Sequence, residues 1–320
     1  MTRFGSAPAI AITSTLALAA GLWLGRSPVA IAADPPAKGP DQLLVLATGS
    51  NRGEVEQCGC KTNPKGGLAR RAALIDSLRQ RGTPLLTVDA GGMLHNDAAQ
   101  GARYDPFIIS AMNRMGYDAV TLGRNELIRG DAQVRALVKQ IQAKVVVTNV
   151  KPKAGVAPWM ESAILTIGGH KVAIVGLVGQ EFDDRSSAID KSGFTVEAPL
   201  AAVARVVPAL AKEADWVVAL AHLDTEDLDR LVAEGKGIDL VVAGYNSFAM
   251  ATQPENAVAT LLRPGQRGEY VGFAHFGAKD AAGGRTPITV ESVVLDVKRF
   301  REDPALASEL ATLKAQAKGD

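Results

Sequence analysis

The chain has 320 residues, of which 47% are hydrophobic and 22% charged, and its formal net charge is +1. This composition is typical of a soluble globular protein with enough apolar residues for a large core. The nearly balanced charge argues against nucleic acid as a partner, because nucleic-acid binders carry a strongly basic surface.

The first 33 residues differ from the rest of the chain. Residues 4–25 carry no charge and are mostly apolar, and Ala30 and Ala32 then form an A-x-A cleavage pattern. This predicts an export signal, with an uncleaved membrane anchor through residues 4–25 as the alternative. Both place the folded part in the periplasm or on the outer face of the cytoplasmic membrane. Residues 34–42 are rich in proline and predict a linker.

From residue 43 to residue 300, short β-branched runs alternate with helical patterns, which predicts one layered α/β domain. Expected strands cover 43–48, 84–90, 118–123, 143–150, 171–177, 215–222 and 237–244. Expected helices cover 67–81, 104–116, 131–141, 198–213 and 224–235.

The later segments break this alternation. The stretch "ESAILTIGGHKVAIVGL" predicts a hairpin with a Gly-Gly turn, and "GEYVGFAHF" followed by "ITVESVVLDVKRF" predicts antiparallel strands. Two packed sheets with helices outside them would accommodate both patterns. Asp303 and Pro304 then give a helix N-cap and a proline at the first helical position, so residues 301–320 are expected to form a C-terminal helix.

The chain has only two cysteines, and both lie in the loop "EVEQCGCKTNPKGGLARR" after the first expected strand. In an exported protein, Cys58 and Cys60 can form a persistent disulfide. A disulfide between residues separated by one glycine closes a very small ring, which departs from relaxed geometry and is comparatively easy to reduce. The spacing therefore predicts a redox-labile pair.

Several phrases resemble, in their order and spacing, the catalytic domain of the 5′-nucleotidase and UDP-sugar hydrolase branch of the metallophosphoesterases. They are "GGLARRAALIDSLR", "LLTVDAGG", "MNRMGYDAVTLGRNE", "VVVTNV", "VAIVGLVG", "DWVVALAHLD" and "GIDLVVAGYNS". The resemblance covers roughly residues 43–277 and implies a four-layer α/β/β/α sandwich with the site at the strand ends. The Cys-Gly-Cys before "GGLARR" is similar to exported UDP-sugar-hydrolase-like (seleno)protein families, which implies thiol chemistry.

Family members hold two adjacent metal ions, which activate water and clamp a phosphate. The positions that match the family's ligands and catalytic histidine carry Ser50, Arg52, Gly92, Arg124, Asn125, His222, Tyr245 and Ser247. Among them only His222 keeps the family's residue, while Glu126 and the earlier Asp89 remain nearby in the sequence. We therefore predict the fold without the dinuclear metal centre and without metal-dependent phosphoesterase activity.

Basic residues have replaced part of the lost site. Arg52 and Arg124 place positive charge where the metal ions would lie, and the cysteine loop adds Lys61 and Lys65. These four residues are expected to bind an anion. The alternative is that the two arginines pair with Asp89 and Glu126 and fill the vacated space. Because the loop leaves the mouth of the site, we expect the thiols near the arginines and His222, in surroundings that favour thiolate.

Three classes of function remain open. The first is a thiol-based redox protein that acts through Cys58 and Cys60 on an anionic or sulfur-containing small molecule or on a redox partner protein, with no cofactor required. The second binds a single zinc or copper ion through both cysteines and His222, with or without His95 as a fourth ligand. The third is a non-catalytic binding module. A 5′-nucleotidase-like hydrolase with a different arrangement of residues is a further alternative.

Overall fold

The computed structural model describes residues 43–179, 189, 192–245, 248–249, 253–277 and 287–317. The export segment expected at residues 1–33, the linker at 34–42 and the candidate Ser247 lie outside the described residues. Within the described part, none of the helices combines the length and the apolar character that crossing a bilayer requires.

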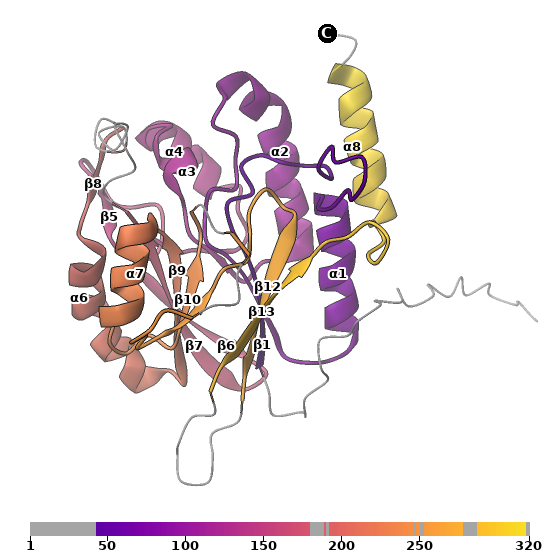
Figure 1. Ribbon diagram of the computed structural model, residues 1–320. Helices are drawn as coiled ribbons and strands as arrows, with labels where there is room; N and C mark the ends of the chain where they lie inside the picture. Colours follow the sequence, from indigo (N-terminus) through magenta and orange to yellow (C-terminus); the bar gives the residue numbers. More distant parts are fainter. Residues whose placement is uncertain are drawn as a thin grey trace, which may run out of the picture.

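The described strands form two main sheets that pack face to face (Figure 1). The first has the order β13-β12-β1-β2-β3-β4. Its strands are β1 (Leu43–Thr48), β2 (Leu85–Asp89), β3 (Ala119–Val120), β4 (Lys144–Val145), β12 (Tyr270–Phe276) and β13 (Thr289–Val294). The first four are parallel, and β12 and β13 pair antiparallel to their neighbours.

The second sheet has the order β11-β10-β9-β7-β6. Its strands are β6 (Ser162–Ile167), β7 (His170–Val178), β9 (Trp216–His222), β10 (Leu240–Ala243) and β11 (Thr260–Leu262), and a separate pair joins β5 (Val150–Pro152) to β8 (Phe194–Val196). The predicted β6–β7 hairpin is confirmed. Gly168 and Gly169 have φ angles of 56° and 88°, as a tight hairpin turn of two residues with positive φ requires.

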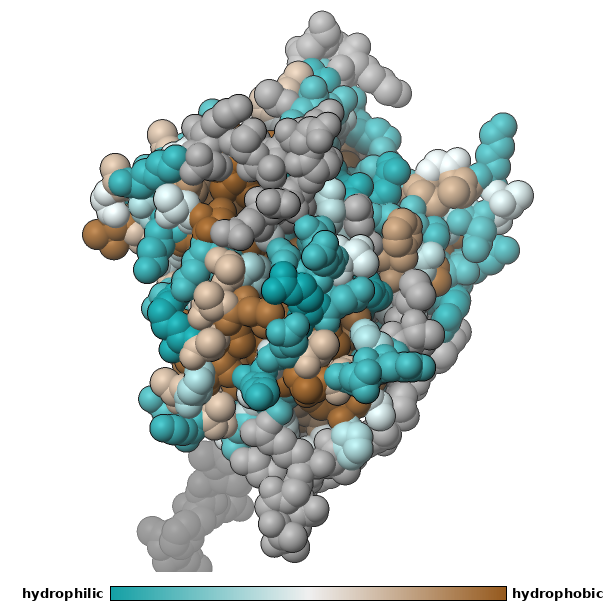
Figure 2. All heavy atoms as spheres, turned by 60° about the vertical axis from the view of Figure 1, so that its left-hand side comes forward, coloured by the Kyte–Doolittle hydropathy of each residue, from teal (hydrophilic) through white to brown (hydrophobic). Residues whose placement is uncertain are grey.

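Helices cover the outer faces of both sheets (Figure 1). They are α1 (Leu68–Gln80), α2 (Ala98–Met115), α3 (Arg124–Leu127), α4 (Asp131–Val138) and α8 (Pro304–Ala317) beside the first sheet, and α6 (Pro199–Glu213) and α7 (Thr225–Glu234) on the second. The face that Figure 2 turns forward shows many polar side chains among apolar ones, as an outer helix layer does.

Strand β1 shows why the sequence builds layers. Side chains alternate between the two faces of a strand. Leu44 and Leu46 pack into the core under the helices, whereas Leu43 and Val45 pack into the core between the sheets. A strand buried on both faces has to be apolar along its whole length, which explains the continuous run in "LLVLAT". The predicted four-layer α/β/β/α sandwich is confirmed.

Several predicted elements differ in extent, and the strand expected at 118–123 covers only Ala119–Val120. Helix α2 begins at Ala98, before the expected residue 104, because the Asp97 side chain caps it by accepting a hydrogen bond from the Gln100 amide, while Pro106 lies inside the helix. The strand expected at 143–150 is short, because the chain crosses between sheets there: the amide of Val146 donates to Val120, and that of Thr148 donates to Gly176 in β7.

Candidate functional site

His222 lies at the end of β9, where the parallel strands of both sheets finish. The residue is 1% exposed, and its Nδ1 atom lies 3.2 Å from the carbonyl oxygen of Ala90. A Cβ atom on Gly92 would lie 2.8 Å from Cε1 of His222, and one on Gly123 would lie 2.7 Å from the same atom. Gly92 and Gly123, which lack side chains, therefore leave the space that this imidazole occupies.

Two arginines and a tyrosine surround the imidazole. The guanidinium carbon of Arg52 lies 5.9 Å from the centroid of the Tyr245 ring, and this ring meets the His222 ring edge-on at 5.5 Å. Burial lowers the pKa of His222 to about 4; the contact with Ala90 opposes this shift, and the charges of Arg52 and Arg124 add to it. The imidazole is therefore neutral at physiological pH. We call these two arginines, the imidazole and the tyrosine the strand-end site.

Glu126 serves the backbone beside this site. Its carboxylate accepts hydrogen bonds from the amides of Gly92, Leu94 and Gly123 at 3.1, 2.9 and 2.7 Å. Burial raises the pKa of Glu126, and these three hydrogen bonds oppose the shift, with the charge of Arg129 as a smaller contribution. This carboxylate therefore fixes the loops that cradle His222.

Asp89 belongs to a buried network behind the site. It accepts a 2.6 Å hydrogen bond from Thr48 Oγ1, and this hydroxyl lies 2.9 Å from the hydroxyl of Tyr117. Arg71 lies 3.4 Å from the same tyrosine hydroxyl and donates a 2.7 Å hydrogen bond to Asn51. Burial raises the pKa of Asp89, and the cation that opposes this shift is Arg71. The cation that acts on Asp89 is thus Arg71, and the one that acts on Glu126 is Arg129. Neither is an arginine of the strand-end site.

Ser50 and Asn125 also hold the local backbone. The Ser50 hydroxyl donates to the carbonyl of Gly244, and the residue has a φ angle of 47°. Asn125, at the position of the family's catalytic histidine, is buried and donates a 2.9 Å hydrogen bond to the carbonyl of Leu94. Both side chains therefore have a positional role in the loops around the site.

The strand-end site does not fit two metal ions. A dinuclear centre needs several carboxylate and imidazole ligands, whereas the matched positions supply one neutral imidazole beside two arginines. Gly92, at the position of the bridging aspartate, has a φ angle of 71°, and the His222 ring fills the space that a side chain would need. Across the described ranges, no group of three or more His, Cys, Asp or Glu residues could hold a metal ion.

The loop with Cys58 and Cys60 is held at its base. Gln57 forms an isolated bridge with Gly66, and the Cys58 amide donates a 2.8 Å hydrogen bond to Lys65. The two cysteines are not joined in a disulfide, and Cys58 is half-buried while Cys60 is exposed. A Cβ atom added to Gly59 between them would have no heavy atom within 4 Å, so the tip of the loop faces solvent.

The two thiols influence each other directly. Partial burial raises the pKa of Cys58, but hydrogen bonds from the backbone and side chain of Cys60 outweigh it, and the net shift is downward. The same thiol–thiol hydrogen bond raises the pKa of Cys60. Cys58 is therefore the thiol of the pair that loses its proton more readily, with Cys60 as its hydrogen-bond donor.

The charged neighbours of the thiols differ from those expected. Lys65 is a neighbour as expected, but Glu269 and Arg267 stand in place of the arginines of the strand-end site. Lys65 is committed to an ion pair of 2.8 Å with Glu269 and a 2.7 Å hydrogen bond to the hydroxyl of Tyr270, and Lys61 is exposed. The loop packs here because the Gly66 amide donates to Leu295, next to β13.

In the described part of the chain, the two cysteines do not form a metal-binding group with His222 and His95, the residues expected to hold zinc or copper. His95 instead pairs through Nδ1 with the Asp105 carboxylate at 3.0 Å, and Arg129 pairs with the same carboxylate at 2.7 Å. We did not expect Asp105 and Arg129 from the sequence. They lie ten and 34 positions beyond His95 in no recognised motif.

No protein-family model matches the chain. A 5′-nucleotidase from the venom of Naja atra is 27% identical over 288 residues, which cover 78% of this chain and 51% of the venom protein. The crystal structure of a 5′-nucleotidase precursor from Thermus thermophilus matches with a TM-score of 0.75 at 20% identity, over 87% of this chain and 59% of that chain. The chain has the metallophosphoesterase fold. The predicted resemblance is confirmed at the level of structure.

A second metallophosphoesterase-fold structure matches over nearly its full length. It is the calcineurin-like phosphoesterase YfkN from Bacillus subtilis, with a TM-score of 0.67 at 21% identity, over 86% of this chain and 97% of that chain. The chain spans about half the length of the curated relatives it matches, 51%, 42% and 45% for three 5′-nucleotidases. Within this fold, the strand-end site occupies the region where the sequence resemblance places the metal centre.

Proposed function

We propose that this metallophosphoesterase-fold protein acts through Cys58 and Cys60 as a thiol–disulfide pair and not through a dinuclear metal centre. The observation that carries the proposal is the pairing of the two thiols in one loop: hydrogen bonds from the backbone and side chain of Cys60 outweigh burial and lower the pKa of Cys58, and the contact with Cys58 raises the pKa of Cys60. Two exposed or half-exposed thiols with opposite shifts suit two successive roles, an attacking thiolate and a resolving thiol.

The chemistry is a two-step exchange. The Cys58 thiolate attacks one sulfur of a substrate disulfide, so that a mixed disulfide forms and the other substrate sulfur leaves as a thiolate. Cys60 then loses its proton and attacks the Cys58 sulfur, which releases the second substrate thiolate and leaves a Cys58–Cys60 disulfide. Two electrons pass from the protein to the substrate, and an external dithiol reductant restores the pair.

An anionic substrate or partner is consistent with the charges on this side of the fold. Arg267 is an electrostatic neighbour of Cys58, and Lys61 is exposed on the same loop. At the strand-end site, the Nε atom of Arg124 is buried and has no hydrogen-bond acceptor among the described residues. A buried donor of this kind is costly unless an acceptor arrives. An oxyanion held between Arg52 and Arg124 would supply this acceptor.

Phosphoester hydrolysis is the second candidate, because the relatives are 5′-nucleotidases. The side chains at the strand ends speak against the metal-dependent form of it, as does the space that His222 takes beside Gly92. A hydrolase on this chain would need a different arrangement of groups. The third candidate function is that of a non-catalytic binding module, in which the cysteine pair takes no part in chemistry.

We also propose that the protein is exported. The apolar segment with its A-x-A pattern supports this, and so do the venom origin of one relative and the precursor form of another. N-terminal sequencing of the protein isolated from its host tests the proposal. A start near Ala33 indicates a cleaved signal, an intact Met1 in the membrane fraction indicates an anchor, and an intact Met1 in the cytoplasm contradicts export.

Trapping experiments test the thiol roles. With the Cys60→Ala variant and a small aromatic disulfide, we expect a stable mixed disulfide on Cys58, detected by mass spectrometry. With Cys58→Ala, the remaining thiol lacks the backbone hydrogen bonds from Cys60 and Lys65 that lower the pKa of Cys58, and it should react more slowly at pH 7. Equal rates for the two variants would contradict the assigned roles. In parallel, robust hydrolysis of 5′-AMP with manganese, zinc or cobalt, abolished by His222→Ala, would favour the nucleotidase alternative.

A further inference from the structure

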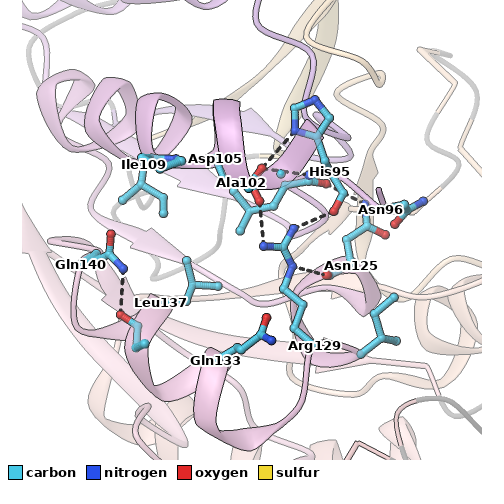
Figure 3. Close-up of a pocket in the computed structure, with 15 residues that line it drawn as sticks. His95, Asn96, Ala102, Asp105, Ile109, Asn125, Arg129, Gln133, Leu137 and Gln140 are labelled. Carbon is cyan, nitrogen blue, oxygen red and sulfur yellow. Dashed lines mark hydrogen bonds and ion pairs between the residues drawn. The ribbon is translucent and has the colours of Figure 1, made fainter. Parts of the chain in front are cut away.

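A pocket of about 720 Å³ lies between α2 and the α3–α4 segment, beside the strand-end site (Figure 3). Its volume is in the range of small-molecule sites, roughly 300 to 1,000 Å³. The pocket borders the strand-end site through Asn125 and through His95, whose ring lies against Gly53, the residue after Arg52. The thiol proposal makes no use of it.

One wall of the pocket is a fixed polar cluster. Arg129 donates to the carbonyls of Asn125 and His95, at 3.0 and 2.6 Å, and pairs with Asp105. Figure 3 shows its guanidinium between Asp105 and the backbone of His95. Asp105 is 5% exposed and also meets Nδ1 of His95.

The charges of this cluster cancel. Asp105 and Arg129 neutralise each other at 2.7 Å, and the other described lining residues carry no carboxylate or ammonium group. A phosphorylated or cationic ligand would therefore find no opposite charge that is not already paired. The remaining polar groups of the lining are the side-chain amides of Asn96, Asn125, Gln133 and Gln140, which can donate and accept hydrogen bonds. Asn125 already donates to the carbonyl of Leu94, and Gln140 to that of Ala136.

Apolar side chains complete the lining. Ile109 lies on the α2 side of the pocket, and Leu137 lies on the α4 side between Gln133 and Gln140, as Figure 3 shows. A ligand that suits both the amides and the aliphatic side chains carries hydroxyl groups on a ring. The hydroxyl groups donate and accept hydrogen bonds, and the C–H surface of the ring packs on the aliphatic side chains. We infer that this pocket binds a neutral polyhydroxylated ring of the monosaccharide class, with its hydroxyl groups on the amides of Gln133 and Gln140.

Calorimetric titration of the folded, full-length chain with D-glucose, D-ribose and glucose 6-phosphate tests the inference. We expect saturable binding of at least one neutral sugar and weaker binding of the phosphorylated one. Ala102→Phe, which fills the pocket from α2, and Gln133→Ala, which removes an amide, should each weaken binding by about tenfold or more. Ala132→Phe is the matched control on the outside of α4, and it should change the affinity less than about twofold.

Several results would overturn the inference: no binding of any neutral sugar, stronger binding of glucose 6-phosphate than of glucose, or equal weakening by Ala132→Phe and Ala102→Phe. The result is independent of the thiol chemistry, because Cys58→Ala should leave sugar binding unchanged. Failure of the sugar test therefore leaves the thiol proposal standing, and failure of the thiol test leaves the pocket standing.

Discussion

The imidazole of His222 lies so close to the backbone of Gly92 that a Cβ atom there would come within 2.8 Å of its Cε1 atom. The resemblance places the bridging aspartate of the metal centre at Gly92, so the histidine occupies the space of the side chain with which it would share a metal ion. The space of the metal centre is therefore filled by the His222 ring, in addition to the loss of the metal ligands themselves.

The first prediction concerns this packing. We expect Gly92→Asp to lower the free energy of unfolding by about 3 kcal/mol, because it adds a contact with His222 to the cost of a positive φ angle. It should not create a tight manganese or zinc site. Denaturant unfolding and metal analysis after dialysis measure both effects.

Gly82→Asp is the matched control, because Gly82 has a φ angle of 76° but no heavy atom within 4 Å of an added Cβ. It should lose only the backbone share, about 1 kcal/mol. Stoichiometric metal on the Gly92→Asp variant, or equal losses for the two variants, would contradict the closed site.

The second prediction concerns pH. The pKa of His222 is lowered from 6.5 to about 4 on folding, so the unfolded chain binds the proton first as the pH falls. The contribution of His222 to stability is therefore fully present above pH 6.5 and is lost as the pH falls toward 4. Between pH 7 and pH 5 the loss is about 2 kcal/mol.

His222→Gln removes this titration and keeps an amide that can donate to Ala90. We expect its unfolding free energy to depend less on pH over the same interval than that of the parent chain, in urea titrations at each pH. The raised pKa values of Asp89 and Glu126 act in the opposite direction, but both proteins share them. Identical pH dependence in the two proteins would show that His222 is not neutral and buried.

The third prediction concerns the thiols. Because Cys60 donates to Cys58, the Cys60→Ala variant should titrate Cys58 at higher pH, whereas Cys60→Ser keeps a hydroxyl donor and should shift it less. The pH profile of Cys58 alkylation, followed by peptide mass spectrometry, gives the order. Arg124→Ala is expected to have no effect. If Arg124→Ala changes the pH at which Cys58 titrates and Cys60→Ala does not, the thiols lie near the strand-end site and the prediction is wrong.

The layers and most elements of the fold could be predicted from the sequence, because they depend on local patterns of apolar residues and turn residues. The continuous apolar runs of β1 and β9 and the Gly168–Gly169 turn predicted their strands and hairpin, and the matched phrases placed Arg52, Arg124, His222 and Tyr245 at one edge. The path of the cysteine loop could not be predicted, because it depends on contacts far away in the sequence. Gly66 bonds to Leu295 and Lys65 pairs with Glu269, and no local signal connects these residues.

Equilibration with glutathione buffers tests the central claim most directly. The reduced protein is mixed with defined ratios of reduced and oxidised glutathione, and its free thiols are trapped and counted by mass. The thiol proposal predicts a reversible two-electron transition, with both thiols lost together to a Cys58–Cys60 disulfide. A pair that stays fully oxidised in strongly reducing buffer, or that gives only independent mixed disulfides with glutathione on each cysteine, would contradict it.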